Sequence, residues 1–271
     1  MYLILVNPKA GNQRYRRIEK SFTNLLSKLD IKHQLVMVDD LANVEDILKH
    51  YAKTKLTAVV AVGGNGTVNT IIDALADYRN LPLSIIPISK TNHLASILGA
   101  KDWKTGLKIL AQHEKKQLRL GKIGEKYFAG SLVVSPKRTL IANFFERKSL
   151  LRSFVGTNIK AIPKEEHHVA CTIKLDDALV VKCQLHTMVI YFQDEFGKKM
   201  KIYLTTYSGK VPEESIFRAD QIEIESSLNM PIISGNEPVA HTPVKIQAIG
   251  KTIPVLAAPS KSPLKKPNKG S

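Results

Sequence analysis

The first hundred residues alternate between short apolar runs and amphipathic helical patterns, and this alternation restricts the fold more than any other feature. Apolar runs lie at 1–6, 33–38, 57–62 and 83–88, and after each run apolar residues recur every three or four positions. The runs are continuous, which is typical of strands buried on both faces. Strands joined by helical crossovers predict a parallel, doubly wound α/β sheet.

After about residue 118 the pattern changes to strands separated by turn signals, which predicts an antiparallel β-sandwich. A basic stretch at 139–154 has a helical pattern. The end of the chain, "PSKSPLKKPNKGS", is rich in Pro, Ser and Lys and is expected to be disordered. We therefore expect an α/β domain at 1–118, a β-sandwich at 119–258 and a disordered basic tail at 259–271.

The formal net charge of +16 points to an anionic partner. Nucleic acid, an anionic membrane surface and a phosphorylated substrate all satisfy this requirement. The basic residues are spread along the chain, as in "RYRR" and "FGKKMK", so they favour a broad weak attraction over one nucleic-acid groove. Aromatic residues make up only 6% of the chain, and no nucleic-acid-binding motif is recognisable. A specific nucleic-acid partner is therefore not expected.

No apolar run reaches the ~18 to 20 residues that cross a bilayer. The N-terminal stretch "MYLILVNPKAG" lacks the basic segment and cleavage site of a signal peptide. We expect a cytoplasmic protein. Cys171 and Cys183 lie in strand-like patterns and are expected to be reduced thiols. The eight histidines show no metal-ligand spacing, so no set of protein metal ligands is predicted.

Three loops at predicted strand ends form the candidate binding site: 7–11 ("NPKAG"), 63–67 ("GGNGT") and 87–95 ("PISKTNHLA"). In open parallel sheets, ligands bind outside the carboxyl ends of the strands. Glycines in the second loop let backbone amides approach a phosphate, and a following helix N-terminus favours negative charge. The pattern predicts a phosphate-binding site, although each loop alone is also typical of an ordinary turn.

These motifs resemble the diacylglycerol kinase catalytic family, which includes sphingosine kinases and bacterial lipid kinases, and more distantly NAD kinase. The chain carries Asn7-Pro8-x-Ala10-Gly11 where the family has N-P-x-[AS]-G. It carries "VVAVGGNGTVN" where the family has the G-G-D-G-T loop, and its closing strands around Glu237 also resemble the family's. The resemblance implies a nucleotide-binding α/β domain and a β-sandwich with the active site between them.

The resemblance also implies roles for individual residues. Glu237 matches the family's proposed general base, and Asn65 stands at the position of the catalytic loop aspartate. ATP and Mg²⁺ are the implied cofactors, and a lipid with a free hydroxyl is the implied substrate, met at a membrane surface. The residues implied in nucleotide binding are Asn7, Pro8, Gly11, Gly63, Gly64, Gly66, Thr67, Lys90, Thr91 and Asn92.

The chain departs from the family pattern at several acidic positions. Asn65 and Thr70 stand where the family has acids, as do His93 and Gly235, and Ser89 replaces a glycine. Mg²⁺ prefers carboxylate oxygens, so its binding should be weakened. A lysine such as Lys90 supplies positive charge to phosphates directly. We expect a nucleotide to bind still, with weakened catalysis.

Two functions therefore stay open from the sequence. One is an ATP-dependent lipid kinase with weakened activity. The other is a catalytically silent relative that binds nucleotide or lipid. Lipid kinase activity is favoured over NAD kinase activity, because the closing strands match the lipid kinases better.

Overall fold

The structure is a computed structural model of the whole chain. The predicted helix at 139–154 and the tail from residue 260 onward lie outside its described residues. The described residues are 1–51, 53–78, 80–89, 92–136, 168–192, 199–209, 211–234 and 237–259.

The N-terminal part is built on a parallel sheet, as predicted. Its strands lie in the order β2–β1–β3–β4, and every pair is parallel. Every residue of β3 and β4 is buried, which explains their continuous apolar sequence. The strands are β1 (Tyr2–Val6), β2 (His33–Met37), β3 (Ala58–Gly63) and β4 (Leu83–Pro87).

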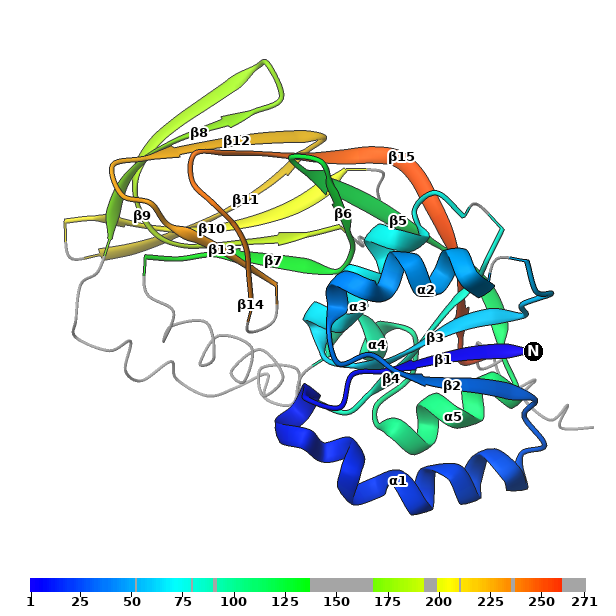
Figure 1. Cartoon of the computed structure of the whole chain (residues 1–271). Coiled ribbons are helices and arrows are strands. Elements are labelled where there is room, and N and C mark those ends of the chain that lie inside the picture. Colours follow the sequence, from blue (N-terminus) through cyan, green and yellow to red (C-terminus); the bar gives the residue numbers. More distant parts are fainter. Residues whose placement is uncertain are drawn as a thin grey trace, which may run out of the picture.

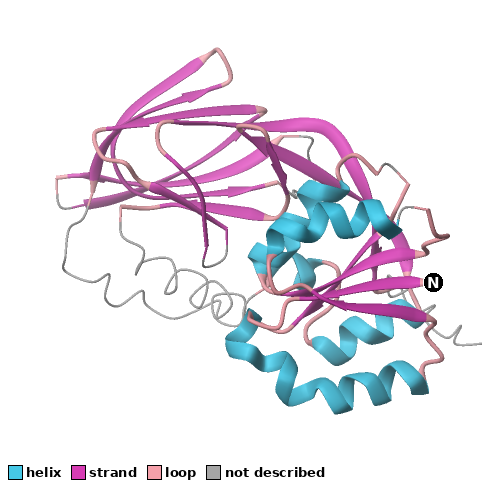
Figure 2. Ribbon diagram, viewed as in Figure 1, coloured by secondary structure: helices cyan, strands magenta, loops and turns pink. Residues whose placement is uncertain are grey.

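Helices cover both faces of this sheet (Figures 1 and 2). α1 and α5 pack together on one face, and α2 and α3 pack together on the other. The apolar sides of these helices and the strands enclose the first hydrophobic core. The helices are α1 (Ala10–Lys28), η1 (Leu41–Asn43), α2 (Val44–Tyr51), α3 (Asn65–Leu75), α4 (His93–Ile97) and α5 (Trp103–Ala111). None of the described helices is long and apolar enough to cross a membrane.

The C-terminal part is antiparallel, which confirms the second half of the predicted fold. Its strands curve around a second hydrophobic core, separate from the first (Figure 1). The strands before the last are β5 (Glu114–Ile123), β6 (Lys126–Phe128), β7 (Ser131–Val134), β8 (Val169–Leu175), β9 (Leu179–Tyr191), β10 (Met200–Ser208), β11 (Val211–Ala219), β12 (Gln221–Ser226), β13 (Pro231–Ser234) and β14 (Glu237–His241).

The last strand, β15 (Val244–Ala257), joins the two parts. It pairs with β12 in the antiparallel part, and Val255 pairs in parallel with Leu83 of β4. It also pairs along its length with β5, and the register between them shifts between Ala248 and Thr252. The described strands consequently form one hydrogen-bonded sheet. The domain boundary at residue 118 stays a prediction, because β5 runs across it.

Candidate functional site

A cavity of about 810 Å³ lies where the loops after β1, β3 and β4 meet. Of the residues proposed from the sequence, it brings together Asn7, Gly11, Gly64, Asn65, Gly66 and Thr67. The loops therefore converge as expected for the carboxyl ends of parallel strands. The other lining residues are Lys9, Ala10, Asn12, Arg14, Arg17, Ile18, Ile88 and Ser89.

The two glycines at the junction of β3 and α3, Gly63 and Gly64, serve different purposes. A Cβ on Gly63 would lie 2.5 Å from Thr67 Oγ1, so the turn into α3 admits no side chain there. A Cβ on Gly64 would meet only Ser89, with its Oγ at 3.6 Å, so protein packing does not require this glycine. The amides in the first turn of α3 lack helical partners, and that turn holds no acid. The open side of Gly64 therefore gives an anion access to this helix end.

The turn after β1 is hydrogen-bonded to the loop at 63–67, which we call the glycine loop. The Asn7 amide Nδ2 donates a hydrogen bond to Thr67 Oγ1 at 2.9 Å, and its Oδ1 accepts one from the Lys9 amide across Pro8. Gly11 adopts φ +59°, and a Cβ there would lie 2.2 Å from the Ile88 carbonyl oxygen. Only glycine fits this contact, so the motif's last residue has a structural explanation.

The third loop contributes Ile88 and Ser89 to the described cavity lining. Lys90 and Thr91 lie outside the described residues. Asn92 is buried and caps α4, because its Oδ1 accepts a hydrogen bond from the Ala95 amide at 2.9 Å. Asn92 therefore shapes the loop, and it is absent from the described cavity lining.

Glu237 is the first residue of β14, and it pairs with Ser234 of β13. Its side chain lies outside the described residues. The Ser234 hydroxyl accepts a hydrogen bond of 2.7 Å from Asn69 Nδ2. Asn69 lies on α3, the helix that begins at the glycine loop. This bond holds the end of the β13–β14 hairpin against the helix that borders the cavity.

Comparison with known proteins agrees with this geometry. Residues 1–123 match the family model of the diacylglycerol kinase catalytic domain. The match covers the parallel part of the chain and β5, and it shows a likeness to that family. A diacylglycerol kinase of Staphylococcus epidermidis is 25% identical over 161 residues, which are 56% of this chain and 48% of the relative. One of Staphylococcus haemolyticus is 27% identical over 161 residues, 56% of this chain and 46% of the relative. The chain thus spans about half the length of the curated relatives that it matches.

A crystal structure of a diacylglycerol kinase from Bacillus anthracis shares the fold over nearly the whole chain. The TM-score is 0.72, and the match covers 95% of this chain and 97% of that one at 16% identity. Both the parallel and the antiparallel parts of this chain therefore share the fold of that structure.

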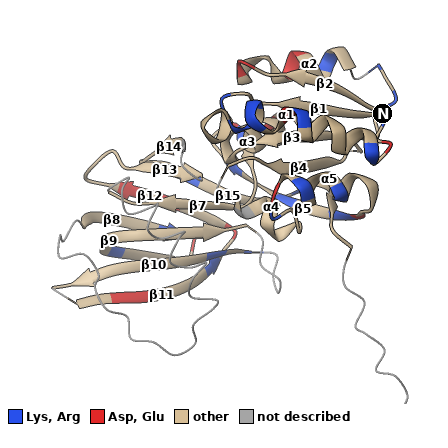
Figure 3. Cartoon of the chain, turned by 90° about the horizontal axis from the view of Figure 1, so that it is seen from below, with Lys and Arg blue, Asp and Glu red and all other residues tan. Residues whose placement is uncertain are grey.

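The basic residues of the cavity lining, Lys9, Arg14 and Arg17, were not among the site residues predicted from the sequence. The run "RYRR" looked like scattered surface charge. Its arginines at 14 and 17 are three residues apart, however, and this spacing places them on one face of a helix. The basic residues of α1 are blue in Figure 3. Arg14 and Arg17 could have been identified from their helical spacing directly after a loop that matches the family motif.

The metal that this family implies does not fit the described cavity. Its described lining has no aspartate or glutamate, and the described residues hold no group of three or more His, Cys, Asp and Glu that could bind a metal. Thr70, at a family acid position, donates its hydroxyl to the Gly66 carbonyl at 3.1 Å. Asp39 and Asp40 follow β2, but neither lines the cavity, and Asp40 caps η1.

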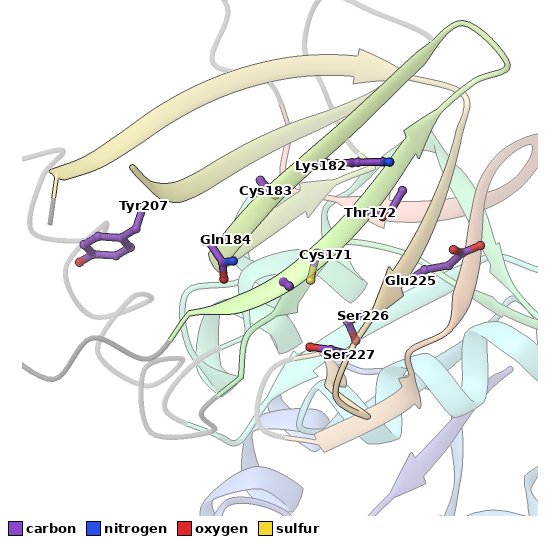
Figure 4. Close-up of a pocket in the computed structure, with 10 residues that line it drawn as sticks. Cys171, Thr172, Lys182, Cys183, Gln184, Tyr207, Glu225, Ser226 and Ser227 are labelled. Atoms are coloured by element: carbon purple, nitrogen blue, oxygen red, sulfur yellow. The ribbon is translucent and has the colours of Figure 1, made fainter. Parts of the chain in front are cut away.

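A second cavity of about 700 Å³ lies along β8, β9 and β12 (Figure 4). Cys171 and Cys183 line it, and they face each other across the β8–β9 pair as free thiols. Burial, together with the neighbouring Cys183, raises the pKa of the Cys171 thiol to about 12. A thiol with this pKa stays protonated and unreactive at neutral pH. We assign no function to this cavity.

Proposed function

We propose that the chain binds ATP in the cavity at the strand ends and transfers its terminal phosphoryl group to a lipid hydroxyl. The observation that carries the proposal is the convergence of Asn7, Gly11 and the 64–67 loop on one cavity with an open helix end. Amides at such a helix end bind phosphate oxygens. The family model that residues 1–123 match and the names of the curated relatives support the same reaction class.

In the proposed reaction, Glu237 takes the proton of the lipid hydroxyl. The lipid oxygen then bonds to the terminal phosphorus, and the bond from that phosphorus to the bridging oxygen breaks, which leaves ADP and a phosphorylated lipid. Phosphoryl transfer depends mainly on positioning and on charge stabilisation. The loops supply the positioning. With Asn65 and Thr70 at family acid positions, the described residues supply less negative charge for a metal, so weakened turnover follows.

The second candidate is a silent relative that binds nucleotide or lipid without turnover. The observation that favours it is the lack of carboxylates in the described cavity lining. Both candidates share the same nucleotide site, so they differ only in whether the phosphoryl group moves.

We also place the lipid substrate at the cytoplasmic face of a membrane. The formal net charge of +16 attracts the chain to anionic lipids, with each nearby basic residue contributing about 1 kcal/mol. A chain bound to this surface takes its nucleotide from solution and its lipid from the bilayer.

Labelled ATP and mixed micelles test this function. Micelles that contain diacylglycerol or sphingosine as acceptor should yield labelled lipid, and more of it when phosphatidylglycerol is added. The increase in labelled lipid that phosphatidylglycerol causes should fade between about 0.1 and 1 M salt, because the Debye length falls from about 10 to 3 Å. ATP binding without labelled lipid under any condition selects the silent relative. Equal rates in neutral and anionic micelles contradict the membrane proposal.

Gly64→Val should weaken ATP binding at least about tenfold, or 1.4 kcal/mol. A Cβ at Gly64 has room beside Ser89, but the branched side chain of valine would occupy the space through which a phosphate approaches the α3 amides. Titration calorimetry measures the affinity, and thermal unfolding checks the fold. Gly250→Val is the matched control, because a Cβ at Gly250 meets nothing within 4 Å. Unchanged affinity in Gly64→Val means that the nucleotide lies elsewhere.

A further inference from the structure

The described lining of the proposed nucleotide cavity carries an excess of positive charge. It contains three cations and no carboxylate. A site that takes a nucleotide together with Mg²⁺ normally offers the metal one or two carboxylates. Here Asn65 offers a neutral amide instead. A divalent cation placed in this cavity would be repelled by the surrounding positive charge.

The cations reach the cavity because of the backbone at the start of α1. Gly11, Asn12 and Gln13 all have left-handed dihedrals, with φ between 56° and 59°. Two of these three residues are not glycine, and residues other than glycine rarely adopt this backbone conformation. The turn sets the direction of the regular helix that follows, and this helix presents Arg14 and Arg17 to the cavity. Backbone strain of this kind is commonly found at binding sites.

Each cation keeps donors to offer a ligand. Arg17 donates one hydrogen bond to the Asn12 carbonyl at 3.2 Å, from a guanidinium with five N–H groups. The Lys9 ammonium donates to the Asp39 carbonyl at 2.9 Å, from three N–H groups. Arg14 and Arg17 are both exposed at the cavity. Guanidinium groups bind phosphate through paired, charge-assisted hydrogen bonds.

We infer that this cavity binds the polyphosphate of a nucleotide as the metal-free anion, with Arg14 and Arg17 neutralising the charge that Mg²⁺ would otherwise neutralise. The inference rests on the proposed nucleotide site and specifies the form of the nucleotide that it takes. Mg²⁺ cancels part of the negative charge of ATP, so magnesium should compete with these arginines for the phosphates.

Calorimetry of the full chain with ATP, in EDTA and in excess Mg²⁺, tests the inference. ATP should bind at least as tightly in EDTA as in Mg²⁺. In EDTA, the double variant Arg14→Gln/Arg17→Gln should lose at least about tenfold in affinity. Arg16→Gln is the matched control: Arg16 lies between the two on the same helix, is exposed and is absent from the described cavity lining. It should change the affinity less than threefold.

Each other outcome overturns the inference. Binding that is tighter in Mg²⁺ than in EDTA shows a metal site and leaves the proposed nucleotide binding intact. A loss in Arg16→Gln that is half or more of the double variant's loss, on a logarithmic scale, shows only a general effect of net charge. Binding in neither buffer overturns the inference and the proposed function together. Thermal unfolding of each variant confirms that the exposed substitutions leave the fold unchanged.

Discussion

Asn65→Asp is expected to raise lipid phosphorylation about 100-fold or more over the unmodified chain. The substitution places a carboxylate on the cavity wall at the start of α3, where the described lining has none. A carboxylate is the ligand type that Mg²⁺ prefers, so the activity gained should require magnesium. The micelle assay with labelled ATP measures it.

Asn24→Asp is the matched control, since it makes the same chemical change at an exposed position of α1 outside the described cavity lining. Mass spectrometry must accompany the assay, because Asn65 precedes Gly66 and such pairs deamidate readily. If Asn65→Asp stays inactive, the other departures from the family, at Thr70, Ser89, His93 and Gly235, have removed more than one residue can restore. The silent relative is then the correct function.

Glu237→Gln should lower phosphorylation by roughly 10²- to 10⁴-fold while leaving ATP affinity unchanged. Glutamine keeps the shape of the side chain but cannot take a proton from the lipid hydroxyl. The backbone of Glu237 is held opposite Ser234, which is itself bonded to Asn69 of α3. The change should therefore affect turnover without disturbing the nucleotide cavity.

Asn65→Asp is the background in which this loss is easiest to measure. Glu213→Gln, at an exposed position of β11, controls for the loss of one negative charge. Full activity in Glu237→Gln would exclude it as the base, and a parallel fall in ATP affinity would show that it helps to hold the nucleotide instead.

Local patterns were sufficient to predict the two kinds of sheet. The fully buried β3 and β4 read as continuous apolar runs, whereas β8 alternates between buried and more exposed positions. The spacing of apolar residues shows whether one or both faces of a strand are buried. Here the strands buried on both faces belong to the parallel sheet, and the alternating strand belongs to the antiparallel part. The pairing of Val255 with Leu83 was not predictable, because it joins residues far apart in the chain and no local pattern marks the partner.

The cavity could be predicted only in part for a related reason. Glycines at strand ends have a local signature, and Gly11, Gly64 and Gly66 lie where the sequence suggested. The contribution of Arg14 and Arg17 depends on the left-handed turn before them. Asn12 and Gln13 have no intrinsic preference strong enough to predict that turn. The sequence therefore predicted that Gly64 and Gly66 lie at the cavity, but not that Arg14 and Arg17 do.

The pairing of β5 with β15 determines how the two halves of the molecule can move. Among the described strands, β5 and β15 each carry side chains in both hydrophobic cores, and they are hydrogen-bonded to each other. A single flexible loop could act as a free pivot, but a two-stranded ribbon resists rotation and yields by bending. The ribbon is irregular between Ala248 and Thr252, where its register shifts. Any bending of the antiparallel part relative to the parallel part is therefore easiest at that point, and the bond from Asn69 to Ser234 opposes it.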